Sequence, residues 1–293
     1  MNILIAGGTG FIGKNLTQRL VQEGHHVFIL TRHTNSYQNN TNITYLDYST
    51  THLPDIHVFI NLAGDSLFGY WTKKKKSRIL SSRINTTRQL INYIKQFSQK
   101  PNLLINASAV GFYGTSEEKI FSEKTTTPGN DFLASVVKEW EKEAMNARLY
   151  GVRTVLLRLG IVLGPEGALP MMKLPAILGF GGKIGHGEQW MSWIHIEDVV
   201  SLILFCIENQ AINGPVNATA PHPVRHQDFM KTLAKVLNRP YWLPVPASMI
   251  RLLMGDMSDL ILKGQYVLPE KALQHGFEFS YPTIKKALKA SIN

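Results

Sequence analysis

The amino-terminal segment carries three glycines whose spacing could form an anion-binding turn. Gly7, Gly10 and Gly13 follow an apolar run and open a helical pattern of apolar residues. Gly7 would allow a tight turn, Gly10 would let a phosphate approach the backbone, and Gly13 would let the helix pack closely on the strand. The positive end of that helix would then face a diphosphate. The segment therefore predicts a dinucleotide site, and its other members are Thr9, Phe11 and Ile12.

The second apolar run indicates which dinucleotide fits. It covers residues 26–30 and is followed by Thr31, Arg32 and His33. A free ribose 2′-hydroxyl is usually held by an acidic residue about 20 residues beyond the glycines, and the sequence has no acid there. The planar guanidinium of Arg32 suits a 2′-phosphate instead, although a solvated arginine at a strand end is the alternative. The pattern predicts NADP(H) as the cofactor.

Apolar runs alternate with helical patterns, and these elements must position the residues above. Strands are predicted at 2–6, 26–31, 43–46, 57–62, 102–107, 153–158 and 215–218, and helices at 11–23, 72–98, 131–149 and 196–208. This alternation favours an α/β fold with a doubly wound parallel sheet and helices on both faces. Ligands of such sheets bind outside the carboxyl ends of the strands. The residues that follow each strand are therefore the candidates for binding.

Further candidates follow the third and fourth predicted strands. Asp47 could accept a hydrogen bond from an adenine amino group, but it could equally cap its own loop. Leu62, Ala63 and Gly64 end the fourth strand, and the last two are small where a dinucleotide would pass. We therefore predict that all four residues line the cofactor site.

The pattern changes after residue 165. Residues 167–189 are rich in Gly, Pro and Met and predict a lid or an insertion that faces the substrate. Beyond residue 221 the predicted elements are mostly helical, at 226–237, 247–262 and 281–291. We predict a cofactor domain made of residues 1–165 and about 190–220. Residues 166–189 and 221–293 would form a smaller, mostly helical substrate domain.

Composition excludes several classes of protein. The 293 residues include one cysteine, Cys206, which cannot form an internal disulfide. No apolar stretch approaches the roughly 18 residues of a membrane span, and the first strand leaves no room for a signal peptide. These features favour a soluble, cytoplasmic protein. The net charge of +10 includes a basic run at 73–76. That run is typical of a solvated helix face, so we do not expect nucleic-acid binding.

Several motifs occur together in a recognisable order. They are GGTGFIG at 7–13, NLAG at 61–64, SAVGFYG at 108–114, LRLGIVLGP at 157–165 and WIHIEDVV at 193–200. In these motifs the chain resembles the extended short-chain dehydrogenase/reductase family. It is most similar to an NAD(P)-dependent epimerase/dehydratase-like sub-family with an uncharacterised C-terminal domain. The resemblance implies a Rossmann fold and a nicotinamide cofactor, but it assigns no substrate.

The chain departs from this family at the active site. The family normally pairs a Ser or Thr with a Tyr-x-x-x-Lys on the next helix, where the lysine lowers the tyrosine pKa for proton exchange. Ser108 matches the serine. Phe132 or Leu133 stands at the tyrosine position, and Val136 or Val137 at the lysine position. The usual acid and its helper are therefore both missing.

Other side chains could replace the missing pair. Tyr113 lies near Ser108, and Tyr70 follows the fourth strand. Lys138 is on the expected helix, where it could reach the nicotinamide ribose or simply be exposed. Arg83 could reach a phosphate or a carboxylate. Arg158 ends a core strand and needs a partner, which could be a structural acid or a ligand.

These observations favour an NADP(H)-dependent oxidoreductase or epimerase-like enzyme that acts on a small polar substrate. A non-catalytic NADP(H)-binding redox sensor is the alternative, because the Tyr and Lys are missing. The histidines show no metal-ligand spacing, so no metal is predicted. The protein could be a monomer or a homodimer.

Overall fold

A seven-stranded sheet forms the centre of the computed structural model, which describes residues 1–292. All neighbouring strands are parallel, in the order β11-β7-β5-β4-β1-β2-β3. The strands are β1 (Asn2–Ala6), β2 (His26–Thr31), β3 (Ile43–Asp47), β4 (Val58–Asn61), β5 (Leu103–Ala109), β7 (Arg153–Leu159) and β11 (Gly214–Ala218). The predicted doubly wound sheet is confirmed.

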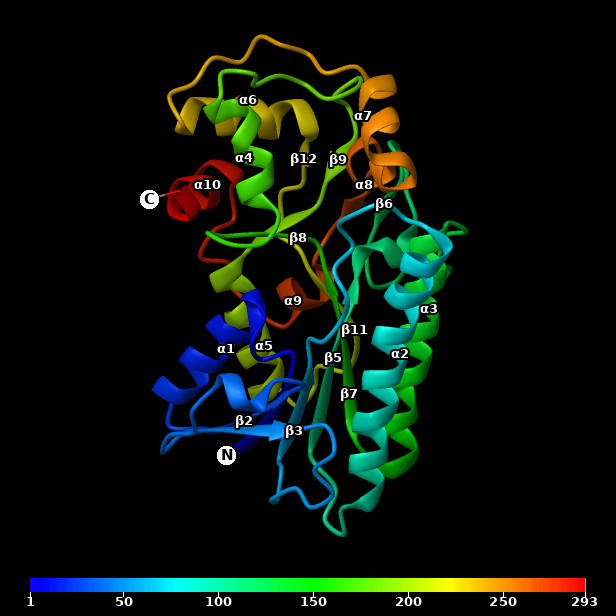
Figure 1. The fold of residues 1–293 in the computed structure, drawn as a ribbon, viewed down its shortest axis with the longest axis vertical. Helices are drawn as coiled ribbons and strands as arrows, with labels where there is room; N and C mark the ends of the chain where they lie inside the picture. Colours follow the sequence, from blue (N-terminus) through cyan, green and yellow to red (C-terminus); the bar gives the residue numbers. More distant parts are fainter. Residues whose placement is uncertain (293) are drawn as a thin grey trace.

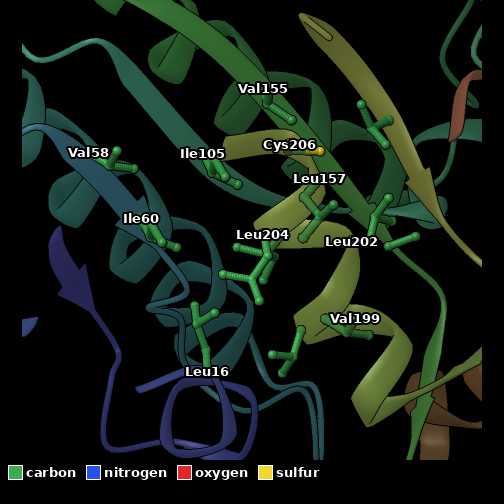
Figure 2. Close-up of a cluster of buried hydrophobic side chains, with 14 of the residues drawn as sticks. Leu16, Val58, Ile60, Ile105, Val155, Leu157, Val199, Leu202, Leu204 and Cys206 are labelled. Atoms are coloured by element: carbon green, nitrogen blue, oxygen red, sulfur yellow. The ribbon is translucent and has the colours of Figure 1, made fainter. Parts of the chain in front are cut away.

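Helices cover both faces of this sheet (Figure 1). Helices α1 (Phe11–Gln22) and α5 (Ile196–Glu208) pack together on one face, and α2 (Lys73–Gln96) and α3 (Phe132–Ala144) pack together on the other. Side chains alternate along each strand, as the pleat requires. Ile3 and Ile5 therefore join the core beneath α1 and α5, while Leu4 faces the opposite core. Figure 2 shows the first of these cores, with Leu16 of α1 and Leu202 of α5 on the same cluster.

The direction of winding reverses at the middle of the sheet. The chain adds β2 and β3 on one side of β1 and then returns to place β4 on the other side. Folds of this kind bind ligands at the carboxyl ends of the strands where the winding reverses. The glycine-rich turn that follows β1 lies at this point.

The C-terminal part is mostly helical and adds short strand pairs at the carboxyl end of the sheet (Figure 1). Its helices are α4 (Leu169–Ile177), α6 (His226–Val236), α7 (Ala247–Met254), α8 (Asp259–Leu262), α9 (Glu270–Gln274) and α10 (Ile284–Ile292). The short pairs are β8 (Ile161–Leu163) with β10 (Trp193–His195), β9 (Trp190–Met191) with β12 (Val224–Arg225), and β6 (Ile120–Phe121) with β13 (Tyr266–Val267). Trp193 and Phe229 are fully buried in a separate core there.

One predicted helix is interrupted. The segment 247–262 forms α7, a 3-10 turn at Gly255–Ser258, and α8. Gly255 has a φ of +54°, which an α-helix does not accommodate. Other 3-10 turns occur at Thr34–Ser36, Val110–Tyr113 and Met145–Tyr150, and the last of these ends the helix predicted over 131–149.

A buried carboxylate joins the C-terminal chain to α5. Asp198 is fully buried and accepts hydrogen bonds from the amides of Ser280 (2.8 Å) and Tyr281 (3.0 Å). Because a buried carboxylate needs hydrogen-bond donors, Asp198 fixes where the segment before α10 docks. Within residues 1–292, no helix combines the length and apolar character needed to cross a membrane.

The buried His226 predicts acid sensitivity. Burial lowers its pKa from 6.5 to about 4, and its Nδ1 has no hydrogen-bond partner. Below about pH 6.5, His226 is therefore protonated in the unfolded chain, whereas in the folded chain it stays neutral down to about pH 4. The free energy of unfolding therefore falls as the pH drops from 6.5 to 4. We expect His226 to account for about 3 kcal/mol of this loss.

Urea unfolding of the His226→Gln variant across this pH range measures the effect. The variant should lose less stability than the wild type between the two pH values. His275→Gln, which removes an exposed histidine, is the matched control and should follow the wild type. Identical pH dependence in all three proteins would contradict the assignment.

Candidate functional site

The turn between β1 and α1 presents unpaired backbone amides. The amide of Gly10 donates to the carbonyl of Gly7 (3.1 Å), and the first bond of α1 runs from Lys14 to Gly10 (2.8 Å). No side chain caps the helix. The amides of Phe11, Ile12 and Gly13 therefore precede the first helical bond and are available to an anion.

Two of the glycines are required by the fold, and the third is not. A Cβ on Gly7 would lie 2.8 Å from the backbone of Leu62 and Ala63, and one on Gly13 would lie 2.3 Å from the Gly7 carbonyl oxygen. Gly10 is exposed, and its nearest neighbour at the Cβ position is that same oxygen, at 3.4 Å. The space beside Gly10 is therefore open. An open cradle next to unpaired amides fits a diphosphate.

The side chains of this turn serve the scaffold. Phe11 packs beneath a second turn, because a Cβ on Gly164 would lie 2.6 Å from its ring and one on Gly167 would lie 3.1 Å from it. Ile12 packs against the core under α1 and α5, and Thr9 is half-buried. Only the backbone of these three predicted residues is therefore directed to a ligand by the geometry of the turn.

The ends of β2 and β3 place two predicted residues near each other. Arg32 is exposed and lies near Tyr48. Burial raises the pKa of Tyr48, and the positive charge of Arg32 partly offsets this rise. Asp47 accepts a hydrogen bond from the amide of Ser49 (2.7 Å), and its hydrogen bonds to Ser49 lower its pKa. The structure therefore shows Asp47 capping its own loop, which was one of its two interpretations, while Arg32 is free to reach a ligand.

The end of β4 brings Gly64 and Arg83 together. A Cβ on Gly64 would lie 3.2 Å from the guanidinium carbon of Arg83. Arg83 donates to the carbonyl oxygens of Ile79 (2.9 Å) and Asp65 (3.2 Å), while the Asp65 carboxylate pairs with Lys75 and Arg78. Within residues 1–292, Arg83 has no ion-pair partner. Desolvation lowers the pKa of Arg83, although the charge of Asp65 opposes this shift, so an anion that approached past Gly64 would meet a partly desolvated cation.

Ser108 and Tyr113 belong to a buried network. The Ser108 hydroxyl donates to Glu141 (2.6 Å), which also holds Arg158 through two bonds of 2.8 Å. A further nitrogen of Arg158 donates to the Tyr113 hydroxyl (2.9 Å), which donates to the side-chain oxygen of Asn217 (2.8 Å). Burial raises the pKa of Tyr113, although Arg158 opposes it. Both hydroxyls predicted to do chemistry are therefore engaged by protein partners.

Glu141, Glu123 and Asn217 were not predicted from the sequence. Asn217 extends the network, because its backbone N–H donates a hydrogen bond to the Glu123 carboxylate (2.8 Å). The sequence did contain a pattern that indicates Glu141. This residue lies one helical turn after Val137, on the face of α3 that also buries Trp140 and Ala144. The core arginine Arg158 required a buried acid, and this helix offered one. Arg158 is therefore part of a structural ion pair.

The helix that should carry the Tyr and Lys has Phe132 or Leu133 at the first position and Val136 or Val137 at the second. Leu133 lies beside the turn after β5, since a Cβ added to Gly111 would be 3.6 Å from the Cβ of Leu133. Val137, one turn later, is buried. Lys138 is exposed and lies apart from the Ser108 network. No group of three or more His, Cys, Asp or Glu within residues 1–292 is arranged to hold a metal ion.

The fold and the turn after β1 define a dinucleotide-type α/β protein with a helical C-terminal part. Comparison with known proteins places it more closely: the chain belongs to the NAD dependent epimerase/dehydratase family, which it matches over residues 3–218. Residues 245–291 match a domain of unknown function, DUF1731. The family resemblance found in the sequence is thereby confirmed.

Relatives match over almost the whole chain. The chain is 48% identical to epimerase family protein YfhF of Bacillus subtilis over 298 residues, which cover 100% of this chain and 98% of that protein. It is 41% identical to an epimerase family protein of Staphylococcus haemolyticus over 295 residues, 99% of this chain and 98% of the relative.

Solved structures agree. The structure of human epimerase family protein SDR39U1 (isoform 2) with NADPH superposes with a TM-score of 0.90 at 31% identity, covering 99% of both chains. The nucleoside-diphosphate sugar epimerase of Corynebacterium glutamicum gives a TM-score of 0.81 at 28% identity, covering 100% of this chain and 58% of that one.

The Glu141–Arg158 pair should contribute strongly to stability. Glu141→Gln leaves a buried guanidinium uncompensated, and such losses cost about 3–5 kcal/mol. Glu143→Gln on the same helix removes a partner of the largely exposed Arg88 and should cost less than about 1 kcal/mol. Urea unfolding at neutral pH compares the two variants. Similar small losses in both would show that the buried pair does not hold this region together.

Proposed function

We propose that the protein is an NADP(H)-dependent oxidoreductase of the epimerase/dehydratase family that acts on a small molecule through an atypical active site. The observation that supports this best is the open space beside Gly10, next to three unpaired amides at the start of α1. Residues 166–189 and 221–293 would cover the substrate. The NADPH in the human relative supports the choice of cofactor.

Each cofactor-side residue has a distinct role in this proposal. The amides of Phe11, Ile12 and Gly13 would bind the diphosphate, and Arg32 would bind the 2′-phosphate through charge-assisted bonds. Ala63 and Gly64 would leave room for the dinucleotide along the carboxyl edge. Bound there, the nicotinamide supplies reversible hydride exchange, while the side chains of this chain orient the substrate and exclude water.

The substrate-side residues would act by position. Ser108 and Tyr113 are held by Glu141, Arg158 and Asn217, so we assign them to the shape and rigidity of the corner after β5. Arg83 would supply a positive charge behind Gly64. Lys138 would remain a surface residue, since it is exposed.

The non-catalytic alternative has an observation in its favour. A redox sensor needs to bind NADP(H) but needs no proton donor. Phe132 or Leu133 stands where the family would place the donor, and Val136 or Val137 where it would place the helper. Turnover of any acceptor decides for the enzyme. A change in partner binding that depends on NADP(H), without turnover, decides for the sensor.

Gly10→Ala tests the cofactor site directly. The methyl group meets no close contact in the protein, so the free energy of unfolding should change by less than about 0.5 kcal/mol. Binding of NADPH, measured by calorimetry, should weaken at least about tenfold because the Cβ occupies the space of the diphosphate.

Lys235→Ala, at the far end of α6, is the control and should bind NADPH like the wild type. Unchanged NADPH binding by the Gly10→Ala variant, or no binding by the wild type, would contradict the proposed function.

Arg32→Asp tests the choice between the two dinucleotides. Loss of a charge-assisted contact and repulsion of the 2′-phosphate should weaken NADPH binding by about 10- to 100-fold. NADH lacks that phosphate and should lose less than about threefold. Arg239→Asp, which makes the same change at another exposed arginine, controls for net charge. Equal losses for the two dinucleotides would refute the role of Arg32.

A further inference from the structure

Basic side chains gather at the edge of the sheet opposite the glycine-rich turn. Arg153 begins β7 and lies level with Leu103, Val58 and Ile3 in the successive strands β5, β4 and β1. Ile3 is near the amino end of β1, whereas the turn of residues 7–13 follows the carboxyl end of that strand. The region beside Arg153 is therefore separate from the turn proposed to bind the dinucleotide.

Arg148 and Lys271 approach each other over Gly214, the first residue of β11. A Cβ added to Gly214 would lie 3.6 Å from a guanidinium nitrogen of Arg148 and 4.0 Å from the ammonium of Lys271. The Lys271 ammonium donates to the backbone carbonyl of Asn213 (2.8 Å), and Arg148 donates to the Asn213 side-chain oxygen (3.5 Å). Asn213 therefore holds the two cations side by side.

Neither cation forms an ion pair within residues 1–292. The acids nearest to them along the chain have other partners. Glu143 pairs with Arg88 (3.0 Å), and Glu270 pairs with Lys124 (2.9 Å). The two cations thus share one place without a neutralising carboxylate in contact.

The Lys271 ammonium is electrostatically unfavourable in this position. Burial is the main cause that lowers the pKa of Lys271, and the half-buried Glu123 carboxylate opposes it. The positive charges of Arg158 and Arg148 lower the pKa further. Like charges repel when no counter-ion lies near. An anion between Arg148 and Lys271 would therefore relieve a repulsion that Glu123 offsets only in part.

A surface depression of about 370 Å³ opens beside Arg148. It is lined by Arg148, Gly151, Val152, Arg153, Thr154 and Asn213. The Arg153 guanidinium is fixed there, because it donates to the carbonyl oxygens of Cys206 (3.0 Å) and Ile212 (2.7 Å). Small-molecule sites occupy about 300–1,000 Å³. The depression is therefore large enough for an oxyanion and for part of a molecule that carries it.

We propose that Arg148, Lys271 and the adjoining depression form a second binding site, which takes a phosphate group, either free or carried by a small molecule. A guanidinium and an ammonium on two sides of one space can both donate charge-assisted hydrogen bonds to a tetrahedral oxyanion. A phosphate monoester carries close to two negative charges at neutral pH, which matches the two cations. The site stands apart from the proposed function, because it involves none of the cofactor residues.

Lys271 also connects this site to the corner that holds Tyr113. The backbone N–H of Lys271 donates to the Glu123 carboxylate (3.3 Å), which also accepts from the backbone N–H of Asn217 (2.8 Å). The Asn217 side chain accepts the Tyr113 hydroxyl (2.8 Å). A phosphate group bound at Lys271 is therefore linked by a continuous chain of hydrogen bonds to the buried network around Tyr113.

Thermal unfolding tests the site without any assay of turnover. In about 20 mM sodium phosphate near pH 7.5, the Tm should exceed by about 2 °C or more the Tm in sodium chloride of equal ionic strength. The sodium chloride arm is needed because salt alone screens the repulsion between the two cations. Glycerol 3-phosphate in a third arm distinguishes a phosphate monoester from free phosphate, and a response to either supports the proposal.

Arg148→Glu separates this site from a general effect of phosphate. The new carboxylate would pair with Lys271, so the variant should keep its Tm in low salt but lose its response to phosphate. Calorimetry should show phosphate binding at least about tenfold weaker than in the wild type. Arg239→Glu makes the same change of charge at another exposed arginine and should respond like the wild type.

Lys271→Gln tests the second cation and should weaken phosphate binding at least about fivefold. Lys100→Gln is the matched control, because Lys100 is also half-buried and its ammonium also donates to a backbone carbonyl, that of Lys95 (2.9 Å). The glycine-rich turn could bind phosphate as well, so the titrations are repeated with the Gly10→Ala variant, in which the response should persist.

Three outcomes overturn the inference. The first is a Tm in both phosphate arms that is no higher than in sodium chloride of equal ionic strength. The second is a wild-type response to phosphate in the folded Arg148→Glu variant. The third is loss of the response in the Gly10→Ala variant, which would assign the phosphate to the glycine-rich turn. NADPH binding enters none of these comparisons, so failure of the proposed function would leave the inference intact.

Discussion

The buried ion pair between Glu141 and Arg158 is the interaction on which the corner formed by β5, β7, β11 and α3 depends. It joins α3 to β7, takes the Ser108 hydroxyl of β5, and reaches β11 through Tyr113 and Asn217. Charges this deeply buried are tolerated only when they are paired and their remaining hydrogen-bonding capacity is satisfied. The network therefore fixes four elements relative to one another, and the Ser108 and Tyr113 hydroxyls are part of it.

The cofactor side depends on close approach of backbones. Gly7 and Gly13 let β1, β4 and α1 meet within distances that a Cβ would prevent. Phe11 then links this turn to the one after β8. Different interactions thus hold the two regions in place. The glycine-rich turn depends on the close steric fit of backbones, and the corner around Glu141 and Arg158 depends on a buried ion pair. A ligand that spans both regions meets a preformed surface, which lowers the entropic cost of binding.

The sequence predicted the sheet and its helices because these follow from local patterns. Apolar runs, glycine spacing and helical periodicity lie within a few residues of one another. The Glu141 network joins residues far apart in the chain, so no local pattern reports it, although an arginine in a core strand indicated that an acid must lie nearby. The break at Gly255 was missed because apolar spacing continues through it, while the backbone conformation that ends the helix depends on tertiary contacts. Single-sequence reasoning thus located the glycine-rich turn at the start of α1, but it could not show which hydroxyls are bound by protein partners.

The engagement of these hydroxyls bears on the positions of α3 where the family resemblance predicts a Tyr and a Lys. A phenol at position 133 would need a neighbouring cation to lower its pKa, and position 137 is a buried valine instead. Arg83 is set behind Gly64 and contacts the ring of Trp140 rather than a phenol, and Lys76 lies over the ring of Phe132 at the start of α3. A guanidinium remains charged throughout the physiological pH range, so it can stabilise an anion but cannot donate a proton to one. At Arg83, therefore, the electrostatics favour stabilisation of a negative charge over proton transfer.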